Sequence, residues 1–247
     1  MNFDSVRIIV LFKKILRRKY LLKPDHWRNW FQIQLIQLFL REPNIPIRQI
    51  GEGYGSWAVP ARSYSEADLV ILVGVGEDVS LDTFFAELGC KTILCDPTPR
   101  AIKHAKEKLS RFGNVEIIEK GIWTSPGRTK FYLPKDSEHV SLSIVNLQNT
   151  SDFIELEVTT IPNLLASFHS KDPSILKLDI EGAAYLVLLD LFEKGIYPQN
   201  VLVDLESSIT TPELLYLLFK FRKLGYNLFW NINRDCLFVR NLDLSLM

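Results

Sequence analysis

A turn with two glycines, Gly74 and Gly76, directly follows the apolar run Leu69–Val73. Because glycine lacks a Cβ atom, such a turn lets a nucleoside cofactor approach the backbone closely. Glu77 and Asp78 complete the turn and join the predicted cofactor site. We interpret the turn as one side of a nucleoside site, and a tight turn without a ligand is the alternative.

An aspartate, Asp96, follows the next apolar run, Lys91–Cys95, and lies twenty residues after Gly76. Open α/β sheets often place an acid at this point, where its carboxylate accepts hydrogen bonds from both ribose hydroxyls. Asp96 could instead cap the helix that begins at Thr98–Pro99, and the two roles are compatible. The glycine turn and Asp96 together predict that two strand ends hold an adenosine.

A third apolar run, Val115–Ile122, is predicted to be a strand that leads into Gly121, Ile122 and Trp123. Backbone and apolar surface at such a strand end suit the stacking of an adenine. We therefore add these three residues to the predicted cofactor site. Packing of Trp123 in the core is the alternative for that side chain.

Two carboxylates, Asp179 and Glu181, lie at the end of the apolar run Ile175–Ile180, where sheets of this kind open onto their ligands. Residues two positions apart in a strand have their side chains on the same face, so both acids can point into the crevice. There they would position a substrate nucleophile or accept its proton. For Glu181 the alternative is a structural role, bonding loop amides. His139, in a polar loop, is a third candidate base, and a solvated side chain is its alternative.

These candidates need a sheet that brings strand ends together, and strand and helix patterns alternate from Asp68 onward. Such alternation is typical of βα units on a parallel sheet. The last two apolar segments, Tyr226–Ile232 and Cys236–Val239, predict an antiparallel hairpin at the sheet edge. The predicted fold is α/β, a Rossmann-like, mostly parallel sheet with an antiparallel C-terminal hairpin. Further strands are expected at Asn200–Leu205, Thr129–Leu133 and Ile154–Thr160. Helices are expected to begin at Thr98–Pro99, at Thr211–Pro212 and directly after Ser80, which is predicted to be the N-cap.

An aromatic helix is predicted over residues 26–40, where apolar side chains recur every three or four residues and Gln32 and Gln37 lie outside the apolar face. Residues 43–60 carry three prolines and three glycines, which predicts a break in regular structure and a boundary. We therefore divide the chain into an N-terminal helical appendage with its linker, residues 1–60, and a main domain, residues 61–247.

Charge and cysteine content limit the expected partners and compartment. Lys plus Arg and Asp plus Glu number 29 each, so we expect no nucleic-acid partner. Three cysteines without a C-x-x-C pair predict a cytoplasmic protein, and the histidine spacing predicts no metal site. No apolar run is long enough for a membrane span. Basic residues between positions 13 and 19 leave open a weak association with an anionic membrane surface, with a solvated helix face as the alternative. A homo-oligomer also stays open.

The sequence resembles the FkbM-type methyltransferases over residues 51–238. The motifs that carry this resemblance follow the family's order, and the one at Asp179–Gly182, with Tyr185 downstream, is the most specific. The chain departs from the family at two places: Ala184 stands where a second glutamate is common, and Asp204-Leu205-Glu206 stands where an acidic–aromatic–histidine motif is common. The matching motifs are Gly76–Ser80, Asp96–Pro99, His139–Ser143 and Leu176–Gly182.

The resemblance implies S-adenosylmethionine as the cofactor and a hydroxyl of a small molecule or a glycan as the methyl acceptor. It places Asp179 and Glu181 toward the acceptor. Two alternatives stay open. An NAD-dependent oxidoreductase or epimerase is opposed by Val79, which replaces the third glycine of the dinucleotide fingerprint. A non-catalytic cofactor-binding module is suggested by Ala184. The resemblance assigns the cofactor site to Gly74, Gly76, Asp96 and Trp123.

Overall fold

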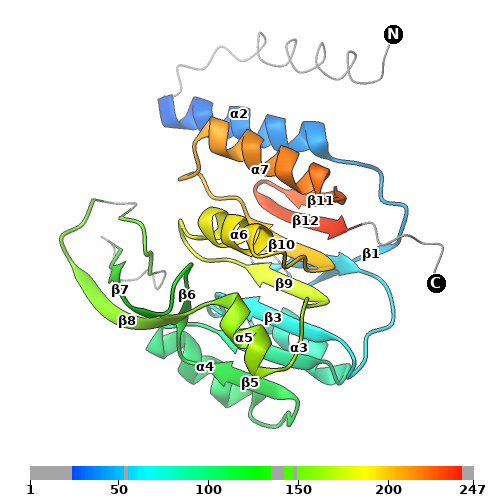
Figure 1. The fold of residues 1–247 in the computed structure, drawn as a ribbon, viewed down its shortest axis with the longest axis vertical. Helices are drawn as coiled ribbons and strands as arrows, with labels where there is room; N and C mark the ends of the chain where they lie inside the picture. Colours follow the sequence, from blue (N-terminus) through cyan, green and yellow to red (C-terminus); the bar gives the residue numbers. More distant parts are fainter. Residues whose placement is uncertain (1–23, 53–54, 135–141, 147–148, 241–247) are drawn as a thin grey trace.

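A seven-stranded sheet forms the centre of the molecule. The structure is a computed structural model, and it describes residues 24–52, 55–134, 142–146 and 149–240. All neighbouring strands are parallel except for the last strand of the chain, which is antiparallel to both of its neighbours. From one edge to the other, the strands are β11 (Tyr226–Ile232), β12 (Asp235–Arg240), β10 (Asn200–Asp204), β9 (Ile175–Leu178), β3 (Leu69–Val73), β4 (Lys91–Cys95) and β5 (Val115–Ile118) (Figure 1).

This sheet confirms the predicted α/β fold and its C-terminal hairpin. All five residues of β3 and all four of β9 are buried, as expected of parallel strands covered on both faces. The chain inserts β12 between β10 and β11, so the hairpin extends the sheet beyond β10. Among the described residues, no helix is both long and apolar enough to cross a membrane.

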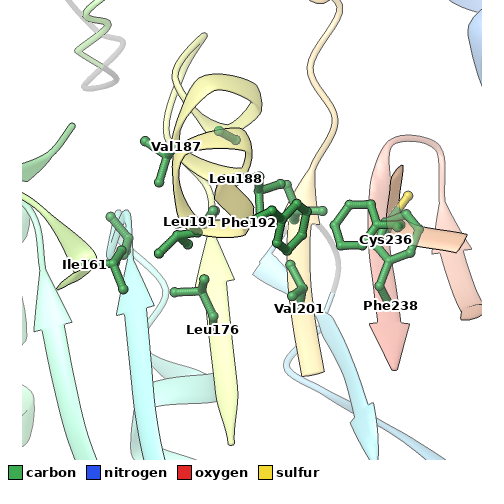
Figure 2. Close-up of a cluster of buried hydrophobic side chains, with 14 of the residues drawn as sticks. Ile161, Leu176, Val187, Leu188, Leu191, Phe192, Val201, Cys236 and Phe238 are labelled. Atoms are coloured by element: carbon green, nitrogen blue, oxygen red, sulfur yellow. The ribbon is translucent and has the colours of Figure 1, made fainter. Parts of the chain in front are cut away.

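Helices cover both faces of the sheet because successive side chains of a strand point to opposite sides. On one face, Leu176 and Val201 pack in one buried cluster with the helix residue Leu191 (Figure 2). On the other face, Val70 and Leu202 pack in a second cluster. The first face is covered by α5 (Ile161–Ser167), α6 (Ala184–Glu193) and α7 (Thr211–Lys223), and the second by α3 (Ser80–Glu87) and α4 (Pro99–Leu109).

A second, three-stranded sheet corrects the prediction of one continuous strand over Val115–Ile122. The chain leaves the central sheet after Ile118, and Gly121–Ile122 pairs with a later strand instead. The apolar pattern runs through both segments, so it does not mark the change of sheet. The order of the second sheet is β6 (Gly121–Ile122), β8 (Phe153–Thr159) and β7 (Gly127–Tyr132), and β7 and β8 confirm two further expected strands.

The predicted N-terminal helix is present as α2 (Pro24–Phe39) and packs beside α7 (Figure 1). One expectation is wrong: Gln32 is fully buried rather than outside the apolar face. Its Nε2 atom donates to the Ile209 carbonyl oxygen at 2.8 Å, and its Oε1 atom accepts a hydrogen bond from the Arg234 guanidinium. A polar side chain can occupy this interior position because both ends of its amide are bonded.

Residues 43–60 were expected to lack regular structure, and this is also wrong. They contain an antiparallel pair, β1 (Ile47–Ile50) and β2 (Trp57–Pro60). All four residues of β2 are buried, and Trp57, Ala58 and Val59 belong to the same apolar cluster as strand residues of the central sheet. The division of the chain at residue 60 stays a prediction, although β2 packs directly on the main sheet.

Two helix starts differ from expectation. Ser80 does not cap α3; it is the first helical residue, and Val79 occupies the N-cap without a side-chain bond. The sequence pattern did not predict α5, whose N-cap Thr160 accepts a hydrogen bond from the Asn163 backbone N–H at 3.1 Å. The expected start of α7 is confirmed, because Thr210 and Glu213 form a reciprocal capping box there.

Candidate active site

A cavity of about 470 Å³ opens at the carboxyl ends of β3, β4 and β9. This volume lies within the roughly 300–1,000 Å³ typical of small-molecule sites. Leu142 and Ile144, from the loop before β8, form part of its wall. Nine of the residues predicted for the site line the cavity: Gly74, Gly76, Glu77, Asp78, Asp96, Gly121, Ile122, Asp179 and Glu181.

The ends of β3 and β4 meet at the Asp96 carboxylate. Its Oδ2 atom accepts a hydrogen bond from the Val75 backbone N–H at 2.8 Å, and its Oδ1 atom accepts one from the Thr98 N–H at 2.7 Å. The second bond lies at the start of α4, in keeping with the alternative role weighed for Asp96. Each carboxylate oxygen has a second lone pair, so Asp96 can still accept hydrogen bonds from a ribose in the cavity.

The two glycines of the turn serve different needs. Both have positive φ, +80° at Gly74 and +63° at Gly76. A Cβ atom at Gly74 would lie 1.8 Å from the Asp179 carbonyl oxygen, so the fold itself requires glycine there. A Cβ atom at Gly76 would meet no protein atom within 4 Å. The backbone at Gly76 therefore borders open space in the cavity, as a site for a closely approaching nucleoside requires.

Glu77 and Asp78 continue the cavity wall. The Glu77 carboxylate forms an ion pair with Arg100 of α4, and both side chains are more than half exposed. Asp78 Oδ1 accepts a hydrogen bond from the Ser80 backbone N–H at 2.8 Å. A Cβ atom at Gly55 would lie 2.1 Å from Asp78 Oδ2, which shows how closely the turn between β1 and β2 approaches the same wall.

Of the three residues predicted to stack on an adenine, the structure brings two to the cavity. Gly121 and Ile122 line it from β6. Trp123 is not among the lining residues, and its side chain packs against the main apolar cluster, as its alternative interpretation holds. The Trp123 backbone N–H continues the pairing with β8, donating to the Thr159 carbonyl oxygen at 2.9 Å.

Asp179 and Glu181 follow β9 directly and both line the cavity. Lys177 Nζ lies 3.2 Å from Asp179 Oδ2 and donates to the Gly74 carbonyl oxygen at 2.6 Å. The Ser143 hydroxyl lies 2.7 Å from the Glu181 carbonyl oxygen and hydrogen-bonds to it. The loop over residues 142–146 is therefore attached to the turn that carries both acids, while His139 lies outside the described residues.

Three acids from the side of β10 and β12 interact electrostatically with the acids of this turn: Glu206, which is buried, and Asp204 and Asp235, which are half-buried. Burial, reinforced by Glu181 and Asp204, raises the pKa of Glu206 to about 9. Burial and the neighbouring Asp235 raise the pKa of Asp204 to about 7, and burial with Asp179 raises that of Asp235 to about 6. Glu206 is therefore protonated at neutral pH, and it accepts a hydrogen bond from the backbone N–H of the residue after Glu181.

The FkbM methyltransferase domain model matches residues 58–228. The chain belongs to the FkbM methyltransferase family. Methyltransferase FkbM from Methylobacillus flagellatus KT is a similar solved structure at 14% identity and a TM-score of 0.48; the match covers 96% of this chain and 60% of that one. An rRNA methylase from Streptococcus thermophilus, also 14% identical, has a TM-score of 0.35, with 90% and 96% covered. A search of curated proteins finds no match.

The two departures from the FkbM pattern lie next to the turn that carries Asp179 and Glu181. Ala184 begins α6 and is 2% exposed, so it offers no polar group there. Glu206, which follows β10, is buried and bonds the Gly182 N–H. In this FkbM domain, the acids that line the cavity on this side are therefore Asp179 and Glu181.

Sequence reasoning missed two buried charged residues of the cavity wall, Lys177 and Asp82. They are 7% and 5% exposed. Each is a charged side chain in an otherwise apolar stretch, Lys177 between Leu176 and Leu178 in β9, and Asp82 on the buried face of α3. That interruption of an apolar pattern is the signal that could have found them, because charged residues are almost never fully buried without a partner. Among the described residues, no group of His, Cys, Asp and Glu side chains could hold a metal ion.

Proposed function

We propose that this FkbM-family domain transfers a methyl group from S-adenosylmethionine to a hydroxyl group of a small molecule or a sugar. The observation that carries the proposal is one cavity with two differently equipped ends. Gly76 and Asp96 border it where the tips of β3 and β4 meet, and Asp179 and Glu181 border it beyond β9. The residues proposed to bind a nucleoside and those proposed to accept a proton therefore line one cavity of about 470 Å³.

The residues at the first end fit an adenosine. Asp96 keeps lone pairs for the ribose hydroxyls, Gly76 leaves space for close approach, and Ile122 offers an apolar surface for the base. S-adenosylmethionine, when bound, supplies an activated methyl group on a sulfonium. Pyrophosphate binding is disfavoured because Val79 occupies the position at which dinucleotide sites need a third glycine for close helix–strand packing.

At the second end, the chain's own residues orient the acceptor and take its proton. Asp179 is held by Lys177 at 3.2 Å, which fixes its carboxylate at the cavity wall. Glu181 lies in the turn that Ser143 and Glu206 hold through backbone hydrogen bonds. Either carboxylate can accept a hydroxyl proton within hydrogen-bond reach. Orientation of the two reactants and exclusion of water supply much of the acceleration of such a displacement.

Calorimetric titration with S-adenosylhomocysteine tests the cofactor assignment. We expect binding to the wild type and a loss of about tenfold or more in Gly76→Ala, whose added methyl group would fill space meant for the ligand. Gly89→Ala is the matched control, because Gly89 also has a positive φ, +78°, and open surroundings, and it ends α3 away from the cavity lining. Absence of heat with the wild type, or binding of NAD instead, would overturn the assignment.

Transfer itself is tested by incubating the protein with radiolabelled S-adenosylmethionine and panels of hydroxyl compounds, glycans and RNA. We expect label in a small molecule or glycan, and loss of label with Asp179→Asn or Glu181→Gln. Label only in RNA would refute the acceptor class, and binding of the cofactor without transfer to any acceptor would favour a non-catalytic module.

A further inference from the structure

One buried carboxyl group in the cavity wall has no task in the proposed transfer. Asp82 is the third residue of α3 and is 5% exposed. Its Oδ1 atom exposes less than 1 Å² to solvent and has no hydrogen-bond partner in the described part of the chain. A buried carboxylate oxygen without a partner is costly, and such groups in native proteins call for an explanation.

The cation that acts on Asp82 does not satisfy its carboxylate. Lys177 attracts it electrostatically, but its ammonium group donates to the Gly74 carbonyl oxygen at 2.6 Å, lies 3.2 Å from Asp179 and stands 5.3 Å from the centre of the Trp57 ring. No ion pair joins Lys177 to Asp82, both of which are described. The other charged groups that act on Asp82, Asp78 and Asp96, are acids. This corner of the cavity therefore has an excess of negative charge.

A compact cation with several N–H donors suits such a corner, because hydrogen bonds between ionised groups are stronger than neutral ones. A primary ammonium group has this chemistry. S-adenosylmethionine has three parts, and two of them have places in the proposed function: adenosine at Asp96 and the transferred methyl group toward Asp179. The third part, the amino-acid arm, carries a primary ammonium group and needs the remaining corner of the cavity, which Asp82 and Trp57 line.

We infer that Asp82 binds the α-ammonium group of the cofactor's amino-acid arm. This inference rests on the proposed function. It assigns a binding role to a residue outside the glycine turn, in the first turn of α3. It also explains why the buried face of α3 includes a carboxylate beside Leu81 and Phe85, where an apolar side chain would otherwise fit.

The test is calorimetric titration of wild type and Asp82→Asn near neutral pH with three thioethers of adenosine. The first is S-adenosylhomocysteine, the second is an aminopropyl thioether that lacks the carboxylate, and the third is a carboxypropyl thioether that lacks the ammonium group. We expect Asp82→Asn to weaken the first two about tenfold or more and to change the third by less than about threefold. Asp190→Asn, on α6 and outside the cavity lining, should change none of them.

Equal losses with all three ligands, or no loss with any, would overturn the role of Asp82. A measurement on the wild type alone guards against a variant that fails to fold: the aminopropyl thioether should bind about tenfold or more tightly than the carboxypropyl thioether, and equal affinities would also overturn the inference. If the wild type binds none of the three, the proposed function itself fails, and this result is distinct from binding that ignores the ammonium group.

Discussion

Replacing Gly74 by alanine should destabilise the fold far more than the same change at another glycine with the same backbone conformation. Gly74 and Gly89 have φ values of +80° and +78°. Alanine in this left-handed region costs about 1–2 kcal/mol at either position. At Gly74 the new Cβ atom would also lie 1.8 Å from the Asp179 carbonyl oxygen, whereas ordinary contacts begin at 3.4 Å. At Gly89 it would meet nothing within 4 Å.

The Asp179 carbonyl group would have to move by about 1.6 Å, the difference between these two distances. Overpacking of this kind typically costs about 1–3 kcal/mol. We therefore expect Gly74→Ala to be less stable than Gly89→Ala by about 1–3 kcal/mol, with a melting temperature lower by about 2–4 °C for each kcal/mol. Urea unfolding followed by tryptophan fluorescence measures the difference. Equal stability of the two variants would refute the contact between the turn after β3 and the Asp179 carbonyl group after β9.

Two further outcomes follow from buried polar groups. Because the folded pKa of Glu206 is raised to about 9, the native state keeps a proton that the unfolded chain has released, so stability falls as pH rises between about 4.5 and 9. In urea titrations, the free energy of unfolding of Glu206→Gln should therefore rise relative to that of the wild type as pH increases through this range, by at most about 1.4 kcal/mol per pH unit. A difference between the two free energies that does not change with pH would contradict the raised pKa. Gln32→Leu should cost roughly 2–3 kcal/mol, because Arg234 and the Ile209 carbonyl group lose their partner, whereas Gln37→Leu, at an exposed position of the same helix, should cost about 0.5 kcal/mol or less. Similar decreases in melting temperature for the two variants would argue against the buried hydrogen bonds of Gln32.

Most of the central sheet could be predicted because its strands are short, continuous apolar runs between helical patterns. The run Lys91–Cys95 is the observed β4, and Tyr226–Ile232 is the observed β11. The contact between the strand tips could be predicted as well, because a glycine turn and an acid follow successive strands of a parallel sheet, whose carboxyl ends lie at the same edge. In the structure, Asp96 bonds the Val75 backbone at 2.8 Å, so the two tips are in direct contact.

Three failed or missed predictions have one physical cause: a local sequence pattern does not show which residues, distant in the sequence, a side chain or strand will bond. Gln32 looks like a surface residue until Arg234, 202 positions later in the chain, bonds its amide. The strand predicted over Val115–Ile122 is divided because Gly121 finds its partner at Val158 of the second sheet. Lys177 follows the same rule, since the Gly74 carbonyl group that it bonds lies 103 residues away.

The guanidinium group of Arg234 has a consequence for how the molecule can be shortened. It donates to Asn29 and Gln32 of α2 and also to the carbonyl oxygens of Leu205 and Glu206. Arg234 therefore joins α2 to the segment after β10, and Glu206 of that segment bonds the turn that carries Glu181. A protein trimmed to residues 61–247 would keep Asp179 and Glu181 but lose the Asn29 and Gln32 side-chain amides that hold Arg234, so α2 belongs to the folded unit that carries the cavity.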